Sequence, residues 1–190
     1  MGIVLEVEKY VREQCMKYQE QAEDSYDFWK EHISYVYQES ITLAKEYGAD
    51  LEIVSLGALL HDIALINQVG DRRDHHINGE KIAREVLEGF SYAPVRMERV
   101  LKCVLHHRSS QNAETIEEKC VADADILAHF DNIPMLFYSA YTRNHVSLSD
   151  IDEYMMATFT KDYQDLSEET RVVFHKRYEE ICHTLFPKKD

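Results

Sequence analysis

The sequence predicts an all-α fold, and three observations lead to this prediction. Apolar residues recur every three to four positions through almost the whole chain, which is the spacing of one helix face. Glycine and proline are scarce, with 6 and 3 among 190 residues, far fewer than a β-rich or low-complexity chain contains. No internal repeat and no linker-like segment divides the chain. We therefore expect one domain over residues 1–190, built of about eight helices.

The first segments carry clear helix signals. Residues 26–48 place their apolar side chains on one stripe, and Gly48 is a typical helix stop. Residues 50–65 begin with Asp50, a favoured N-cap, and are apolar nearly all round. A helix with that composition is typically central and buried.

Proline and capping residues place the other boundaries. Pro94 suits the first turn of a helix, Pro134 limits the helix before it, and Ser167 opens an S-x-x-T/E-like cap. Asn112 precedes an acidic first turn. We expect the remaining helices over residues 3–20, 74–90, 93–109, 112–133, 134–145, 147–163 and 166–186.

Side chains that bind metals lie in the apolar parts of several of these helices. His61 and Asp62 stand side by side in "LGALLHDIAL", and Asp123 and Asp125 lie in "CVADADILAHF". His32 lies beside the apolar stripe of its own helix. Burying such groups without partners costs a few kcal/mol each. Helices packed around one core can bring them together to hold a metal, and imidazole with carboxylate suits Zn, Fe, Mn, Co or Ni, with Mg as a further candidate.

His32, the "HD" pair at 61–62 and "DADIL" at 123–127 together resemble the H…HD…D signature of the HD-domain metal-dependent phosphohydrolases. The resemblance covers roughly residues 25–140, and residues 141–190 add C-terminal helices that vary within the family. It implies four metal ligands: His32, His61, Asp62 and Asp125. For the last ligand, Asp123 is the second choice.

Additional histidines resemble those of family members that hold two metal ions. "HHINGEKIA" places His76, and "VLHHR" places His106 and His107, at positions similar to the extra ligands of those members. Within "VLHHR", His107 is a better match to the family's ligand position than His106. The resemblance therefore implies one or two ions. The remaining histidines are expected to be structural or solvent-exposed: His75, His129, His145, His175 and His183.

The charge distribution favours a small phosphorylated substrate. The net charge of −14 argues against a nucleic-acid polymer or an anionic membrane surface as partner. Residues 72–108, however, hold eight Lys/Arg against five Asp/Glu, so that this segment is locally +3. Within it, Arg108 and Arg73 are our candidates for phosphate contact, because guanidinium grips phosphate bidentately. After "HD" the family often continues with Gly-Lys, whereas this chain reads "IALINQ", so a phosphate contact that some members use must come from elsewhere.

The resemblance implies hydrolysis of a phosphoester or phosphoanhydride bond, in a nucleotide or another small metabolite, by metal-activated water. His61 and Asp62 are the expected catalytic residues, with Asp62 also orienting the water, as the resemblance implies. Two alternatives stay open: a non-catalytic nucleotide-binding module of the same fold, and a di-iron oxygenase. None of the four cysteines forms a C-x-x-C pair, so we expect reduced thiols in a cytoplasmic protein. The N-terminal apolar run is too short for a signal peptide. The sequence leaves the oligomeric state open, a homo-oligomer included.

Overall fold

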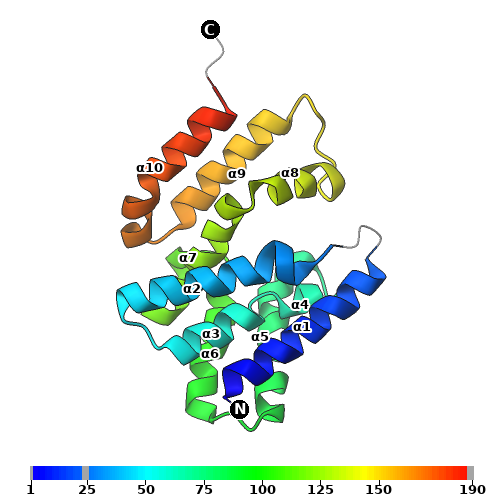
Figure 1. The fold of residues 1–190 in the computed structure, drawn as a ribbon, viewed down its shortest axis with the longest axis vertical. Helices are drawn as coiled ribbons and strands as arrows, with labels where there is room; N and C mark the ends of the chain where they lie inside the picture. The colour runs from blue at the N-terminus through cyan, green and yellow to red at the C-terminus, as the bar shows by residue number, and fades with distance from the viewer. Residues whose placement is uncertain (1, 23–25, 188–190) are drawn as a thin grey trace.

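A computed structural model describes residues 2–22 and 26–187, and within these ranges the chain is helical, with no β-strand. The helices fall into a larger body and a C-terminal group (Figure 1). The larger body contains α1 (Ile3–Gln21), α2 (Ser34–Tyr47), α3 (Leu51–Leu60), α4 (Ile63–Ile66), α5 (His75–Gly89) and α6 (Pro94–His106). The C-terminal group contains α8 (Ile133–Thr142), α9 (Ile151–Asp165) and α10 (Glu168–Leu185). The all-α prediction is confirmed.

The helix α7 (Ile116–Asp131) lies between the two groups and packs against both. Its most extensive contacts are with α2, and it also contacts α3, α6, α8 and α9. Most of its residues are buried, including Val121, Ala124 and Phe130. Because α7 is surrounded on nearly every side, a polar side chain on it must have a partner.

Three predicted helix boundaries are confirmed by the structure. Gly48 ends α2 with a φ of +70°, a left-handed conformation that glycine adopts without strain. Pro94 occupies the first turn of α6. The hydroxyl of Ser167 accepts a hydrogen bond from the backbone N–H of Thr170 and so caps α10.

Other boundaries differ from the prediction. The expected helix over 50–65 is broken into α3 and α4, because Asp62 has a φ of −103° and a ψ of 17° and leaves the helical conformation. Asn112 does not cap α7 but ends a short 3-10 turn (Ser110–Asn112), and Thr115 is the N-cap instead. Within the described ranges, no helix has both the length and the hydrophobicity that a membrane span requires.

Close helix packing fixes α3 and α5 around the break. A Cβ added at Gly57 on α3 would lie 2.6 Å from Cβ of Cys103 on α6. A Cβ at Gly79 on α5 would lie 3.3 Å from the backbone oxygen of His61. Glycine at these two positions therefore lets α5 and α6 approach the residues around the "HD" pair.

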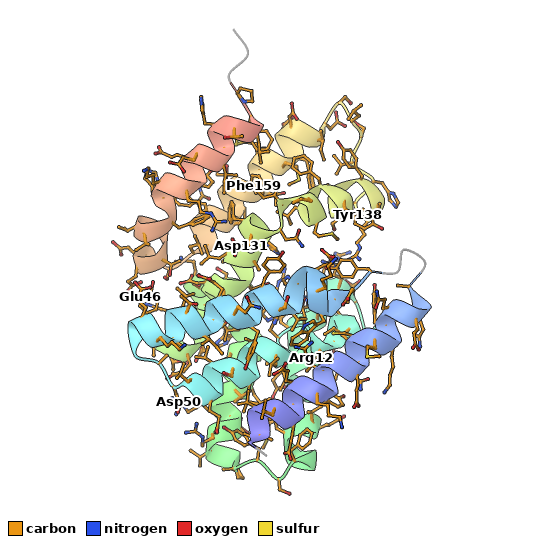
Figure 2. The ribbon with its side chains drawn as sticks, viewed as in Figure 1. Arg12, Glu46, Asp50, Asp131, Tyr138 and Phe159 are labelled. Carbon is orange, nitrogen blue, oxygen red and sulfur yellow. The ribbon has the colours of Figure 1, made fainter. Side chains whose placement is uncertain are left out.

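Asp50, labelled in Figure 2, is the N-cap of α3 and accepts hydrogen bonds from the backbone N–H groups of Glu52 and Ile53. Arg96 of α6 also grips its carboxylate with two N–H groups, at 2.9 and 3.0 Å. Hydrogen bonding to Arg96 lowers the pKa of Asp50 below its usual value. The start of the helix that leads to the "HD" pair is thus tied to α6.

This lowered pKa predicts a pH-dependent contribution to stability. Because the folded-state pKa of Asp50 lies below the unfolded one, the stabilisation is fully present above the unfolded pKa of about 4 and is lost as the pH falls through the folded pKa. In urea unfolding, Asp50→Asn, which keeps an N-cap, should be less stable than wild type at pH 7, and the difference should shrink at about pH 3. An equal difference at both pH values would contradict the prediction.

Candidate metal centre

His32 lies in a π-helical turn, Trp29–Ile33, that leads directly into α2. Such turns are rare and often occur at functional sites, because the extra residue changes the direction in which side chains point. The guanidinium of Arg12 lies 3.6 Å from the ring centroid of Trp29, so this tryptophan packs against α1. The turn aims the His32 ring at the break between α3 and α4.

The break itself presents His61 and Asp62. His61 is the C-cap of α3, and its side chain is fully buried. The backbone oxygen of Asp62 accepts hydrogen bonds from the N–H groups of Leu65 and Ile66, so the turn is stabilised by the start of α4. An interrupted helix allows two consecutive side chains to face the same site, which a regular helix with about 100° between neighbours does not.

A first cluster of donor atoms consists of His32, His61, Asp62 and Asp125. Nε2 of His32 lies 3.1 Å from Nε2 of His61, 3.4 Å from Oδ2 of Asp62 and 3.2 Å from Oδ1 of Asp125. Nε2 of His61 lies 3.6 Å from the same oxygen of Asp62 and 3.7 Å from that of Asp125. The structure therefore brings together all four residues that the resemblance implies as ligands of one ion.

A second cluster uses the other oxygen of Asp62. Oδ1 of Asp62 lies 3.3 Å from Nε2 of His75 and 3.7 Å from Nε2 of His107, and these two nitrogens are 2.9 Å apart. The Asp62 carboxylate is thus shared, with one oxygen facing each cluster. This arrangement can hold two cations side by side.

The orientation of the histidines supports cation binding. His61, His75 and His107 each direct Nδ1 at the backbone oxygen three residues earlier, at 2.7, 2.7 and 2.6 Å, on Ala58, Arg72 and Val104 respectively. A carbonyl accepts only a donor, so Nδ1 carries the proton and Nε2 presents a lone pair. Two such lone pairs 2.9 Å apart, on His75 and His107, repel each other unless a positive charge lies between them. The donor set therefore fits a divalent metal, which would bind the lone pairs on Nε2 of these histidines.

Burial and the charges of neighbouring side chains shift the pKa values of several residues in the clusters. Burial alone would lower the pKa of His32, but hydrogen bonds with Asp125 and Asp62 outweigh it and raise the pKa to about 10. Burial would raise the pKa of Asp62, yet the interactions with His61 and His32 hold it well below its usual value. Burial and the neighbouring His61 lower the pKa of His107 to about 4. The first cluster thus favours a positive charge at its centre, and His107 favours its neutral form.

Two of the predicted ligands lie elsewhere. His76 and His106 do not join either cluster, and His75, which the sequence analysis left as a structural residue, stands beside Asp62 instead. Neighbouring residues on a helix point about 100° apart, so only one member of each "HH" pair can face the clusters. On α5 it is the first member, and at the end of α6 it is the second. His106 turns to Glu118 of α7, with Nδ1 2.6 Å from Oε2.

This difference between neighbouring histidines predicts the result of a metal count. His75→Ala should bind about one ion per chain fewer than wild type, because the second cluster keeps only Asp62 and His107. His76→Ala, the matched control on the next residue, should retain the wild-type count. Elemental analysis of the two purified variants checks this. A loss of metal from His76→Ala alone would contradict the assignment.

Asp123 is not near the clusters. Its carboxylate is fully buried and accepts hydrogen bonds from Ser110, Ser167 and Thr170. Because Asp123 and Asp125 are two residues apart on α7, they point to different sides of the helix. Of these two aspartates, Asp125 is the one that the structure places at the cluster.

A cavity of about 250 Å³ opens beside the clusters, and four cationic residues line it: Arg72, Arg108, Arg143 and Lys161. Arg73, predicted as a phosphate contact, is not among them, because its side chain is 90% exposed and pairs with Asp71. The Arg108 guanidinium donates a hydrogen bond to the backbone oxygen of Arg73.

His129 lines the same cavity and was missed as a site residue. Its ring stacks on that of His32, with centroids 6.1 Å apart, and its Nδ1 lies 2.9 Å from Oδ2 of Asp162 on α9. Burial would lower the pKa of His129, but the hydrogen bond to Asp162 raises it. The four-residue spacing from Asp125, one helical turn, is the sequence signal that could have identified it.

Comparisons with known proteins agree with this geometry. The sequence profile of the HD domain matches residues 29–129, which is more than half of the chain. A tRNA (cytidine(56)-2'-O)-methyltransferase from Picrophilus torridus is 31% identical over 136 residues, and the match spans 66% of this chain but only 39% of that protein. The crystal structure of an HD-superfamily hydrolase from Bacillus thuringiensis has a similar fold, with a TM-score of 0.67, 20% identity and coverage of 95% of this chain and 93% of the other. With the histidine and aspartate clusters in place, the profile match shows that the chain belongs to the HD-domain family.

Proposed function

We propose that this protein is a metal-dependent phosphohydrolase that acts on a small phosphorylated compound. The observation that carries the proposal is the Asp62 carboxylate, which faces one donor cluster with each of its oxygens beside a cavity lined by four cations. Two-metal hydrolases use a pair of ions a few ångströms apart for in-line displacement at phosphorus, and Asp62 would supply one ligand atom to each ion.

Two divalent ions are proposed, with Mn, Fe, Zn, Co or Ni as candidates and Mg as a further one. His32, His61, Asp62 and Asp125 would hold the first, and Asp62, His75 and His107 the second. Bound ions of this kind lower the pKa of water toward neutrality and draw charge from a phosphoryl oxygen. Asp62, which lies between the two clusters, would also orient the attacking water, and His61, whose side chain is fully buried, would help to hold the first ion.

The remaining residues of the cavity suit a phosphorylated substrate. Arg72, Arg108, Arg143 and Lys161 meet the charge of the phosphate, and guanidinium does so with two parallel hydrogen bonds. Apolar side chains, Leu65, Met135 and Leu136 among them, form another part of the cavity wall and reduce the access of water. A small substrate is favoured over a nucleic-acid polymer because the chain as a whole carries −14 and the cations lie inside a cavity of about 250 Å³.

The test is phosphate release by protein of known metal content. The full chain is purified without chelator, its ions per chain are counted, and phosphate release is measured on nucleotides, sugar phosphates and pyrophosphate. We expect about two ions per chain and an activity that chelator abolishes and added Mn²⁺ or Fe²⁺ restores. Binding of nucleotide without turnover would instead support a regulatory module. Oxygen uptake with Fe²⁺ and no phosphate release would support the oxygenase alternative.

A further inference from the structure

A second pocket, with a volume of about 510 Å³, adjoins the metal cavity. The two pockets share Arg108 and Lys161, so these two side chains mark the boundary between them. A phosphate that lies near the metal clusters and touches Arg108 and Lys161 would therefore have the second pocket on its other side.

His106, one of the two predicted ligands that do not join the metal clusters, lines this second pocket in a fixed orientation. Its Nδ1 lies 2.6 Å from the Glu118 carboxylate, which is 1% exposed and also accepts hydrogen bonds from the backbone N–H of Glu114 and the hydroxyl of Thr115. A carboxylate held by donors accepts from His106, so that Nε2 is the ring nitrogen left for a ligand.

Its polar groups suit an uncharged ligand better than a second anion. Apart from Arg108 and Lys161 at the boundary, the pocket is lined by no lysine or arginine among the described residues, and it contains the Asp165 carboxylate. Asp165 is itself oriented, because it accepts hydrogen bonds from Ser109 and Lys161. The Asp165 carboxylate, which pairs with Lys161, can still accept from a hydroxyl, and Asn112 adds an amide that can donate and accept.

We propose that the second pocket binds the hydroxyl-bearing part of the substrate, a sugar or another polyol, while the phosphate lies at the Arg108 and Lys161 boundary. This inference rests on the proposed phosphohydrolase function and names the substrate class as a phosphorylated polyol. Sites built to hydrogen-bond hydroxyl groups reject analogues that lack them, because the buried polar groups then stay unpaired.

The experiment compares two ligands that differ only in hydroxyl groups. Ribose 5-phosphate and tetrahydrofurfuryl phosphate share a five-membered ring that carries a CH2–O–phosphate group. Only ribose 5-phosphate has hydroxyl groups on the ring. Calorimetric titration of the full chain loaded with Mn²⁺ should give a Kd at least about tenfold lower for ribose 5-phosphate. Equal Kd values would overturn the proposal, as would failure of ribose 5-phosphate to bind below about 10 mM.

Variants assign the preference to this pocket. Asn112→Ala changes an exposed residue and should move the ratio of the two Kd values toward one. His106→Phe keeps an aromatic ring at this position and should also move the ratio of the two Kd values toward one. This variant leaves Glu118 without one hydrogen-bond partner, so Asn112→Ala carries the test if His106→Phe unfolds. Asn144→Ala, an exposed asparagine that lines neither pocket, should keep the wild-type ratio. An unchanged ratio in Asn112→Ala and in folded His106→Phe would overturn the assignment.

Phosphate release is measured on the same samples and separates the two proposals. A Kd preference without release from either compound would refute the hydrolase and leave the polyol subsite standing. Release from both compounds with equal Kd values would refute the subsite and leave the hydrolase standing.

Discussion

Asp62→Ala is expected to abolish phosphate release and to lower the metal content from about two ions per chain to one or fewer. The reason is that one side chain supplies a ligand atom to both clusters, through Oδ2 to the first and Oδ1 to the second. Charge stabilisation by bound ions contributes several kcal/mol to such reactions, so the loss in kcat should be on the order of 10³-fold or more. Elemental analysis and a phosphate-release assay measure the two effects.

The control for this variant is Asp131→Asn, which changes an aspartate at the end of α7 whose carboxylate pairs with Arg177. It should keep the wild-type metal content and activity. If Asp62→Ala folds, as judged by its circular dichroism, and still binds two ions, the shared-carboxylate arrangement is wrong.

Among the substitutions proposed for this protein, Asp123→Ala is expected to cause the largest loss of folding stability. The Asp123 carboxylate accepts four hydrogen bonds, from the Ser110 hydroxyl, the Ser167 hydroxyl and backbone N–H, and the Thr170 hydroxyl, at 2.5 to 2.8 Å. Removing it leaves several buried donors without partners, which should lower the free energy of unfolding by about 3–5 kcal/mol. For a chain of this length, thermal denaturation followed by circular dichroism should show a Tm lower by roughly 10 °C.

Two comparisons make this prediction specific. Asp123→Asn keeps the volume and one oxygen acceptor, so its loss should be smaller than that of Asp123→Ala. At a temperature where Asp123→Ala and Asp125→Ala are both folded, Asp123→Ala should retain its metal ions. Asp125→Ala should lose the ion of the first cluster. A melting temperature of Asp123→Ala within about 2 °C of wild type would refute the structural role.

The residues of the first cluster were predicted through the resemblance to the HD-domain family, and the surroundings of three of them supported that prediction. His61 and Asp62 interrupt an apolar segment, and Asp125 lies in another, so each raises the question of what satisfies it. The choice between His75 and His76, or between His106 and His107, depends on the rotation of α5 and α6 about their axes. That rotation is set by packing, such as the close approach of Gly79 to the backbone oxygen of His61, and no local pattern reports it.

The basic residues of the cavity were harder to predict for a similar reason. Arg73 and Arg108 were chosen because they lie in a basic segment, but Arg143 directly follows α8 and Lys161 lies on α9, far along the sequence. Their position depends on how the C-terminal helices pack on α7.

The π-helical turn at His32 and the break at Asp62 also deviate from regular helix geometry, which hydrophobic periodicity alone does not reveal.

The attachment of the C-terminal helices has an evolutionary consequence. The metal clusters lie within residues 29–129, whereas Arg143, Lys161 and Asp162 reach the cavity from outside that range. Asp123, which is inside it, anchors the N-terminus of α10 through Ser167 and Thr170. Sequence change in residues 133–185 during evolution can therefore alter this part of the cavity wall without altering any residue of the metal clusters. Chimaeras that exchange residues 133–185 between homologues, assayed for metal content, would test whether the two parts are separable in this way.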